Sequence, residues 1–171
     1  MKLPYGIIEA VRVVTSRKTG DWCQYPYPGH PKGCPNYGRQ GCPPDAPFIT
    51  EIMDLRRPVY IAFSEFYLDG HIAKMRMKHP DWTEKQLRNV LYWQGTSRKQ
   101  MRQRARIAQF YSGGGVVLTC PEAHGVNVYT TCFCSGLKIQ KIKNITTCRH
   151  IALVGFRKEN SDGKGFNSNR I

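Results

Sequence analysis

The sequence predicts an α+β fold with one small mixed sheet, several helices and an irregular loop rich in proline, glycine and cysteine. Short runs of branched and aromatic residues, typical of strands, occur near both ends and in the middle of the chain. Segments with helical periodicity and capping residues lie between them. The 171 residues suffice for one core and show no internal repeat. We therefore expect a single domain over 1–157 and a polar tail, 158–171, without fixed structure.

The N-terminal half is expected to begin with a strand at 5–15, where isoleucine and valine are frequent. The irregular loop follows. A short helix over 46–55 comes next, because Asp45 is a good N-cap and Pro47 suits a first helical turn. The aromatic and branched run at 59–68 then predicts a second strand.

The second half is expected to be helical first and then to return to strands. A short helix is predicted before Pro80, and Thr83 with Gln86 forms a capping box for the next helix. A further helix over roughly 96–111 ends at a run of three glycines. Three short strands complete the fold, at 116–120, 126–134 and 151–156.

Composition bears on the compartment. The chain contains no run of 18 apolar residues, so no membrane-spanning helix is expected. The N-terminal segment resembles a first strand more than a signal peptide, which favours a cytoplasmic location. Disulfides are rare in the cytoplasm, so the seven cysteines favour metal ligation, catalysis or burial.

The charge is strongly positive and unevenly distributed. The net charge is +14, and residues 85–158 hold thirteen basic residues but a single acid, Glu122. A local excess of this kind favours a polyanionic partner, most often nucleic acid. The alternative is a basic surface that only keeps the protein soluble.

The cysteines form the sharpest chemical pattern. Cys23, Cys34 and Cys42 lie in a loop that also holds six prolines between 23 and 44. Prolines directly follow Cys34, Cys42 and Cys120, a pairing often seen beside iron–sulfur ligands. Zinc sites usually contain closely spaced cysteine pairs, which this loop lacks. The pattern therefore favours a [4Fe–4S] cluster over zinc, which stays the alternative.

The segment "CPNYGRQGCPPDAP" resembles the loop of a family of small cysteine-rich proteins predicted to bind iron–sulfur clusters. The family pattern is C-x-N-Y-G followed by C-P-P. The stretch "PEAHGVNVY" at 121–129 is also similar to a later segment of that family. The resemblance implies a bound cluster but no particular reaction. The close-spaced cysteines that the family carries in mid-chain are missing here, and a basic segment stands in their place.

The fourth ligand stays open in the sequence. Cys120 is the first choice, because a proline follows it, and Cys148 is the second. With three cysteine ligands only, one iron would be open to a substrate, and His30, Glu122 or His124 could assist there as weak candidates. Cys132 and Cys134, two apart in a predicted strand, would share one face that meets either a cluster or the core.

The basic segment "TSRKQMRQRAR" is the second pattern. On a helix Arg98, Arg102 and Arg106 recur every four residues, with Lys99 beside them, so they form one stripe. A phosphate backbone would neutralise their mutual repulsion. Met101, Ala105 and Ala108 are expected to pack inward, and Arg104 to point elsewhere. The aromatic residues flanking the segment could stack on bases or belong to the core: Trp82, Tyr92, Trp93, Phe110 and Tyr111.

These patterns leave three functional hypotheses. The first is an iron–sulfur protein with a nucleic-acid-binding face, which could catalyse sulfur or redox chemistry on a nucleotide or RNA. The second is a non-catalytic module, stapled by zinc or a cluster, that binds nucleic acid or docks in an assembly. The third is an electron-transfer subunit whose positive face meets an acidic protein partner.

Overall fold

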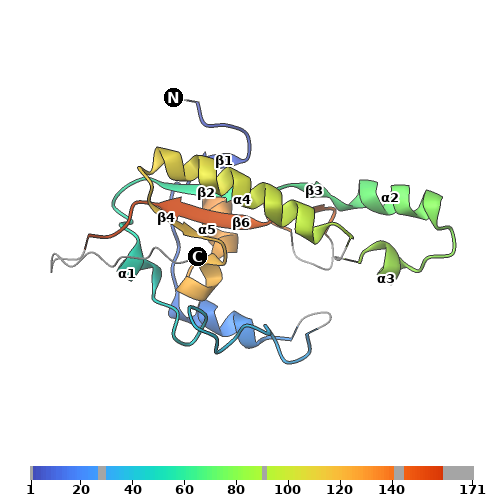
Figure 1. The fold of residues 1–171 in the computed structure, drawn as a ribbon, viewed down its shortest axis with the longest axis horizontal. Helices are drawn as coiled ribbons and strands as arrows, with labels where there is room; N and C mark the ends of the chain where they lie inside the picture. The colour runs from blue at the N-terminus through green and yellow to red at the C-terminus, as the bar shows by residue number, and fades with distance from the viewer. Residues whose placement is uncertain (1, 27–29, 90–91, 141–144, 160–171) are drawn as a thin grey trace.

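The computed structural model describes residues 2–26, 30–89, 92–140 and 145–159 (Figure 1). It confirms the α+β class. The described part combines a four-stranded and a two-stranded sheet with helices. Every described strand pairing is antiparallel, so the sheet is antiparallel rather than mixed. Most of the expected tail, from 160 on, lies outside the described residues.

The main sheet has the order β1-β2-β6-β4. Its two central strands, β2 (Val59–Phe63) and β6 (Ile151–Gly155), are almost entirely buried, as their branched and aromatic residues predict. The short strands β1 (Ile7–Glu9) and β4 (Val116–Leu118) flank them. Because β6 is antiparallel to both β2 and β4, the first residues of β6 lie at the same end of the sheet as the last residues of β2 and β4.

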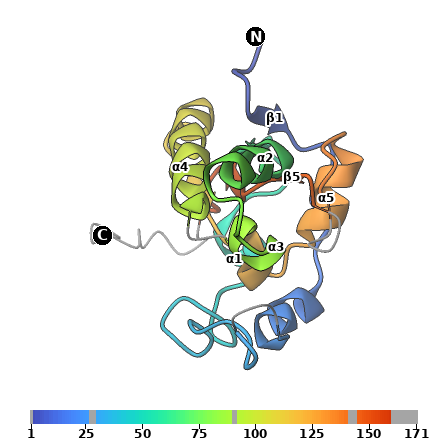
Figure 2. The ribbon, with the colours of Figure 1, turned by 90° about the vertical axis from the view of Figure 1, so that its right-hand side faces the viewer.

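One face of this sheet is covered by α4 (Gln94–Tyr111). Met101, Ala105 and Ala108 point inward, as their spacing predicts, and pack on Ala62 and Ala152. The opposite face carries the larger core, to which α1 (Ile49–Ile52) and α5 (Val128–Cys134) contribute. Figure 2 shows α4 and α5 on opposite sides of the sheet.

A smaller unit extends from the sheet edge (Figure 1). It contains α2 (Leu68–Lys78), α3 (Glu84–Leu87) and a small sheet of β3 (Phe66–Tyr67) and β5 (Thr147–Cys148). The predicted capping box of α3 is present: Thr83 accepts from Gln86 N, and the Gln86 side chain accepts from Thr83 N. Leu68, Ile72, Leu87, Trp93 and Cys148 form its core.

The expected strand at 126–134 is wrong, because this segment is the helix α5. The Asn127 side chain accepts a hydrogen bond from Thr130 N at 3.0 Å and so caps the helix. Val128, Thr131 and Cys132, at helical spacing, are buried. The cap and this packing override the strand propensity of the branched residues.

Other predicted elements are shorter than expected. The strand at 5–15 is paired only over 7–9, because Val11 N and Val14 N donate to hydroxyls of α5 instead. The helix at 46–55 spans only 49–52, with Phe48 rather than Asp45 as N-cap. It ends early because Asp54 N donates to the carbonyl of Phe156 beyond β6, at 2.9 Å.

The run at 59–68 also differs from its prediction. It divides into β2 and β3, and Leu68 already begins α2. Ser64 N donates to His150 O at 3.0 Å, and β3 pairs with β5 in the register that β2 has with β6, so the two strand pairs form one interrupted ladder. The helix expected near 96–111 is α4, and Ser112 is its C-cap. No helix of the described residues is long and apolar enough to cross a membrane.

The central position of Leu153 gives a stability prediction. Its side chain is 1% exposed and faces the larger core. Leu153→Ala should lower the free energy of unfolding by about 2–5 kcal/mol, because it removes buried methyl groups and leaves a cavity. Urea titration measures this loss. Val11→Ala, at a position 79% exposed, is the control and should change stability little; equal losses in the two variants would contradict the assigned core.

Candidate metal centre and basic face

Cys23 lies in η1 (Arg17–Gln24), and Cys34 and Cys42 lie on the loop that joins η1 to α1. The loop folds back on itself early, since Cys34 N donates to Cys23 O at 2.6 Å. Gly33 permits this approach: its φ is +83°, and a Cβ atom there would lie 2.5 Å from Cys23 O. The backbones of Cys23 and Cys34 are thereby held side by side.

A second pair of turns directs Cys42 back toward the same region. Tyr37 N donates to Cys34 O at 3.1 Å, and Cys42 N donates to Arg39 O at 2.9 Å. Gly38 N donates to Pro43 O at 2.8 Å and closes the end of the loop. The loop is therefore ordered by consecutive turns, as its proline and glycine content predicts.

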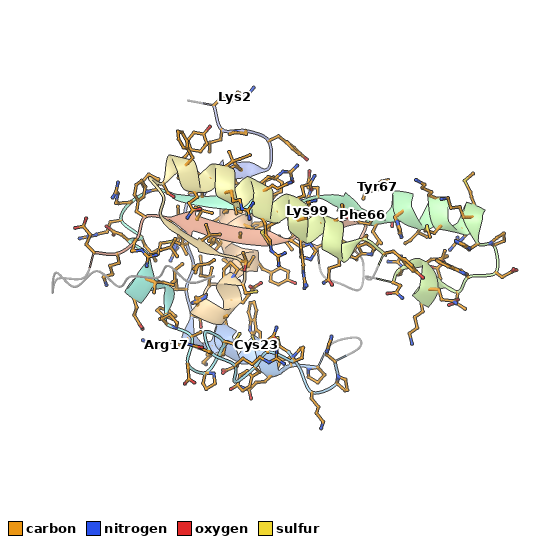
Figure 3. All side chains as sticks on the ribbon, viewed as in Figure 1. Lys2, Arg17, Cys23, Phe66, Tyr67 and Lys99 are labelled. Carbon is orange, nitrogen blue, oxygen red and sulfur yellow. The ribbon has the colours of Figure 1, made fainter. Side chains whose placement is uncertain are left out.

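Cys120 reaches this loop from the sheet. It directly precedes η3 (Pro121–His124), which packs against η1. Two hydrogen bonds fix this junction: Ser16 N donates to Gly125 O at 2.7 Å, and His124 Nδ1 lies 2.8 Å from Pro47 O. Figure 3 shows Cys23 in the loop region on the far side of the sheet from Lys99 of α4.

The four predicted ligand thiols are electrostatic neighbours. Burial, and after it the charges of Cys34, Glu122, Cys120 and Cys42, together raise the pKa of Cys23 to about 11. The pKa of Cys23 therefore responds to three other cysteines, and we call these four side chains the thiol group: Cys23, Cys34, Cys42 and Cys120.

The thiol group suits a soft metal by donor type but is not closed around an ion. In the described ranges no three histidine, cysteine, aspartate or glutamate side chains are positioned to hold a metal ion. A single zinc ion requires four ligands about 2.0–2.3 Å away, whereas a cluster takes thiolates that are farther apart. By donor type alone, four thiols suit an iron–sulfur cluster better than they suit a hard cation.

Glu122 is the acid nearest to the thiol group. Burial raises its pKa, while its own backbone N–H acts in the opposite direction. Its charge is among the causes that raise the pKa of Cys23, Cys120 and Cys132. The raised pKa makes this carboxyl easier to protonate than the carboxyl of an exposed glutamate.

The two histidine candidates have different surroundings. His124 is tied through Nδ1 to Pro47 O, so it connects η3 to the chain entering α1. His30 is an exposed loop residue whose carbonyl accepts from Gly33 N at 3.1 Å. The contact of His124 gives it a structural role whether or not it also assists chemistry.

The remaining cysteines lie apart from the thiol group. Cys132 is buried in α5, and burial raises its pKa to about 12, whereas Cys134 is exposed. The two therefore do not share a face, since they lie on a helix and not on a strand. Cys148, the second choice for the fourth ligand, is buried against Leu68 and Trp93, and the charges that shift its pKa are those of Arg88 and Asp69.

The basic stripe of α4 faces solvent as predicted. Arg98, Lys99, Arg102 and Arg106 are all exposed, and none of them forms an ion pair in the described part of the chain. Arg104 points elsewhere, also as expected. It donates to Phe63 O at 2.6 Å and lies over the Tyr5 ring.

Arg98 connects the stripe to the thiol group. Burial raises the pKa of Cys120, and Glu122 adds to this, whereas a hydrogen bond from Thr119 and the charge of Arg98 lower it. Arg98 also contributes, after burial, to the lowered pKa of His150. The N-terminal end of the stripe therefore adjoins the sheet edge at which Cys120 lies.

The sequence did not point to His150, which belongs to a buried hydrogen-bond network. Its Nδ1 lies 2.9 Å from Ser97 Oγ, and Ser97 Oγ lies 2.8 Å from Ser64 Oγ. Ser64 also accepts from His150 N at 3.1 Å. Burial lowers the pKa of His150 to about 4, so the imidazole is neutral at pH 7. The contacts are 33 and 53 residues apart in sequence, so no local pattern could have revealed them.

The flanking aromatic residues divide between core and surface. Trp93 is 8% exposed and stacks on Phe66 at 4.9 Å, so it belongs to the core. Trp82 stacks on His79 and on Tyr92, which is itself half exposed. Phe110 is 84% exposed at the end of α4.

A pocket of about 170 Å³ lies against the cysteine loop. It is smaller than the usual small-molecule site of about 300–1,000 Å³. Pro43, next to Cys42, and Ala123, next to Glu122, belong to its wall together with Arg17 and Phe48. A small molecule bound there would lie beside the thiol group.

The His150 network predicts a pH dependence of stability. The folded pKa is about 4, below the ordinary 6.5, so the unfolded chain binds the proton more readily. Stability should therefore fall as the pH is lowered from about 6.5 to about 4, and this loss should be absent above that range. The free energy of unfolding of His150→Gln, measured by denaturant titration across these pH values, should fall less steeply. Parallel curves for the two proteins would refute the assignment.

Comparison with family models, with curated proteins and with solved structures gives no match. The resemblance of the cysteine loop therefore rests on the quoted residues alone.

Proposed function

We propose that the protein binds a polynucleotide along the basic stripe of α4 and holds an iron–sulfur cluster on the thiol group. One observation carries this proposal: Arg98 belongs to the exposed stripe and also influences the thiol of Cys120. A phosphate bound by Arg98 would thus lie next to the sheet edge from which Cys120 joins the other three cysteines.

The cluster is supported by the chemistry of the loop. Its backbone is held by turns and not by a sheet or a long helix, so a bound centre would add the cross-link that the segment itself lacks. The pKa of Cys23 is well above neutral, so its thiol is protonated without a cation nearby. A metal centre would remove these protons and relieve the repulsion among the sulfurs.

The nucleic acid is supported by uncompensated charge. Four exposed cations lie within the nine-residue stretch 98–106 of α4, and no described carboxylate pairs with them. Phosphates would neutralise these charges and release counterions. No sequence-specific reading motif is present in the chain, so the proposal concerns the polynucleotide backbone.

The surrounding residues suggest how the site would work. A bound cluster would supply redox or sulfur chemistry. Arg98 would hold a phosphate beside Cys120, and Glu122, whose pKa is raised by burial, would be the acid nearest to the thiols. The substrate of this chemistry would be a nucleotide within the bound polymer.

Iron and sulfide analysis tests the cluster. Protein purified without oxygen should be brown and contain iron and acid-labile sulfide. Serine variants of Cys23, Cys34, Cys42 and Cys120 should each lose iron, because thiolates are the ligands. Cys134→Ser is the exposed control and Cys148→Ser the buried one, and both should keep it. A colourless protein with stoichiometric zinc, or loss of iron only in Cys148→Ser, would contradict the assignment.

Polynucleotide binding tests the stripe. Replacing Arg98, Arg102 and Arg106 together by Gln should weaken binding and reduce the slope of log K against log salt by about 2, at about 0.7 per contact with a single strand. The control replaces three exposed lysines outside α4 by Gln: Lys18, Lys78 and Lys85. This control removes the same charge and should leave the slope nearly unchanged. Equal effects of the two triple variants would remove the stripe from the proposal.

A further inference from the structure

Phe110 is an exposed apolar ring at the C-terminal end of the basic helix. It is 84% exposed, which is unusual for a side chain that gains free energy from burial. Its position is ordered by a neighbour: the Tyr111 ring meets it edge-on, with centroids 6.0 Å apart and planes at 83°. Tyr111 is in turn packed beside Tyr60 of β2 at 6.2 Å. The ring is therefore presented to solvent by the fold.

Phe110 lies on the same side of α4 as the cations. At about 100° per residue, Arg98, Arg102, Arg106 and Phe110 fall near 0°, 40°, 80° and 120° around the helix. Lys99 falls near 100°, between the last two. Met101, Ala105 and Ala108, which pack inward, fall near 300°, 340° and 280°, so they border the stripe at Arg98 and lie opposite Phe110. The stripe and the ring thus form one continuous surface.

The length of this surface matches a short stretch of nucleic acid. The twelve steps from Arg98 to Phe110 rise about 18 Å along the helix axis. A stacked strand rises about 3.4 Å per nucleotide, so the surface spans about five nucleotides. Four cations over that length can approach most of the phosphates.

Charge decides between the possible occupants of this surface. An apolar protein partner would have to bury four cations that no described carboxylate compensates, which is costly. A polynucleotide offers both a negative backbone to the arginines and flat apolar bases to the phenyl ring. In a duplex the bases are paired and stacked on each other, so a lateral ring meets the charged backbone instead.

We propose that the polymer bound by α4 is single-stranded and that Phe110 stacks on one of its unpaired bases. This inference rests on the proposed polynucleotide binding and names the substrate class. The arginines hold the backbone of the polymer. The ring of Phe110 holds one base at the C-terminal end of α4. Because every base has an aromatic face, this contact carries little sequence preference.

Binding measurements with paired oligonucleotides test the proposal. A fluorescent 16-nucleotide single strand should bind more tightly than the same sequence as a blunt duplex. Phe110→Ala should weaken single-strand binding by about 5- to 150-fold, the range of one stacking contact. It should leave duplex binding and the salt slope unchanged, because no charge is removed. Phe110→Trp should restore binding.

The matched control is Phe133→Ala, a phenylalanine 77% exposed on α5 and away from the stripe. It should bind both oligonucleotides as the unmodified protein does. Equal affinity for strand and duplex, or an unchanged affinity in Phe110→Ala, would overturn the single-strand proposal while leaving polynucleotide binding in place. Absence of binding to either oligonucleotide would instead refute the proposed function itself. A change in oligomeric state in Phe110→Ala, with binding unchanged, would make the ring a contact between copies.

Discussion

The close contact between α4 and the sheet is the constraint on which the rest of the structure depends. Ala105 and Ala108 of the helix meet Ala62 and Ala152 of the two central strands, and all four are almost completely buried. Small side chains allow a helix to approach a sheet closely without voids. Because the contact uses only this narrow strip, the remaining circumference of α4 is free to carry charge. The same contact fixes the N-terminal turns of α4 beside the end of the sheet at which Cys120 and His150 lie.

The cysteine loop depends on a different principle. It contributes little to the main core, and its order comes from local turns and from η3 packing on η1. The close approach of Cys23 and Cys34 requires a glycine at Gly33, so the loop geometry is set by backbone and not by side-chain packing. A segment of this kind can adjust to a bound centre without disturbing the sheet. The fold and the candidate site are therefore largely separable.

The sequence predicted what local rules control and missed what distant contacts decide. The capping box of α3, the buried face of α4 and the strand β6 follow from propensity and periodicity, and the structure confirms them. The strand predicted at 126–134 is wrong, because the cap at Asn127 and the buried face of α5 outweigh the strand propensity of the branched residues. His150 could not be found, since its serine partners come from β2's end and from α4.

The inward-pointing side chain of Arg104 limits how many counterions α4 can release when a polymer binds. Five cations lie between 98 and 106, but one of them is bound to a backbone carbonyl of β2 and covered by Tyr5. Only four can exchange a mobile counterion for a fixed phosphate. At about 0.7 ions per contact with a single strand, the helix can release about three ions. Any larger number must come from cations elsewhere on the protein, so a count of released ions measures how far a bound polymer extends beyond α4.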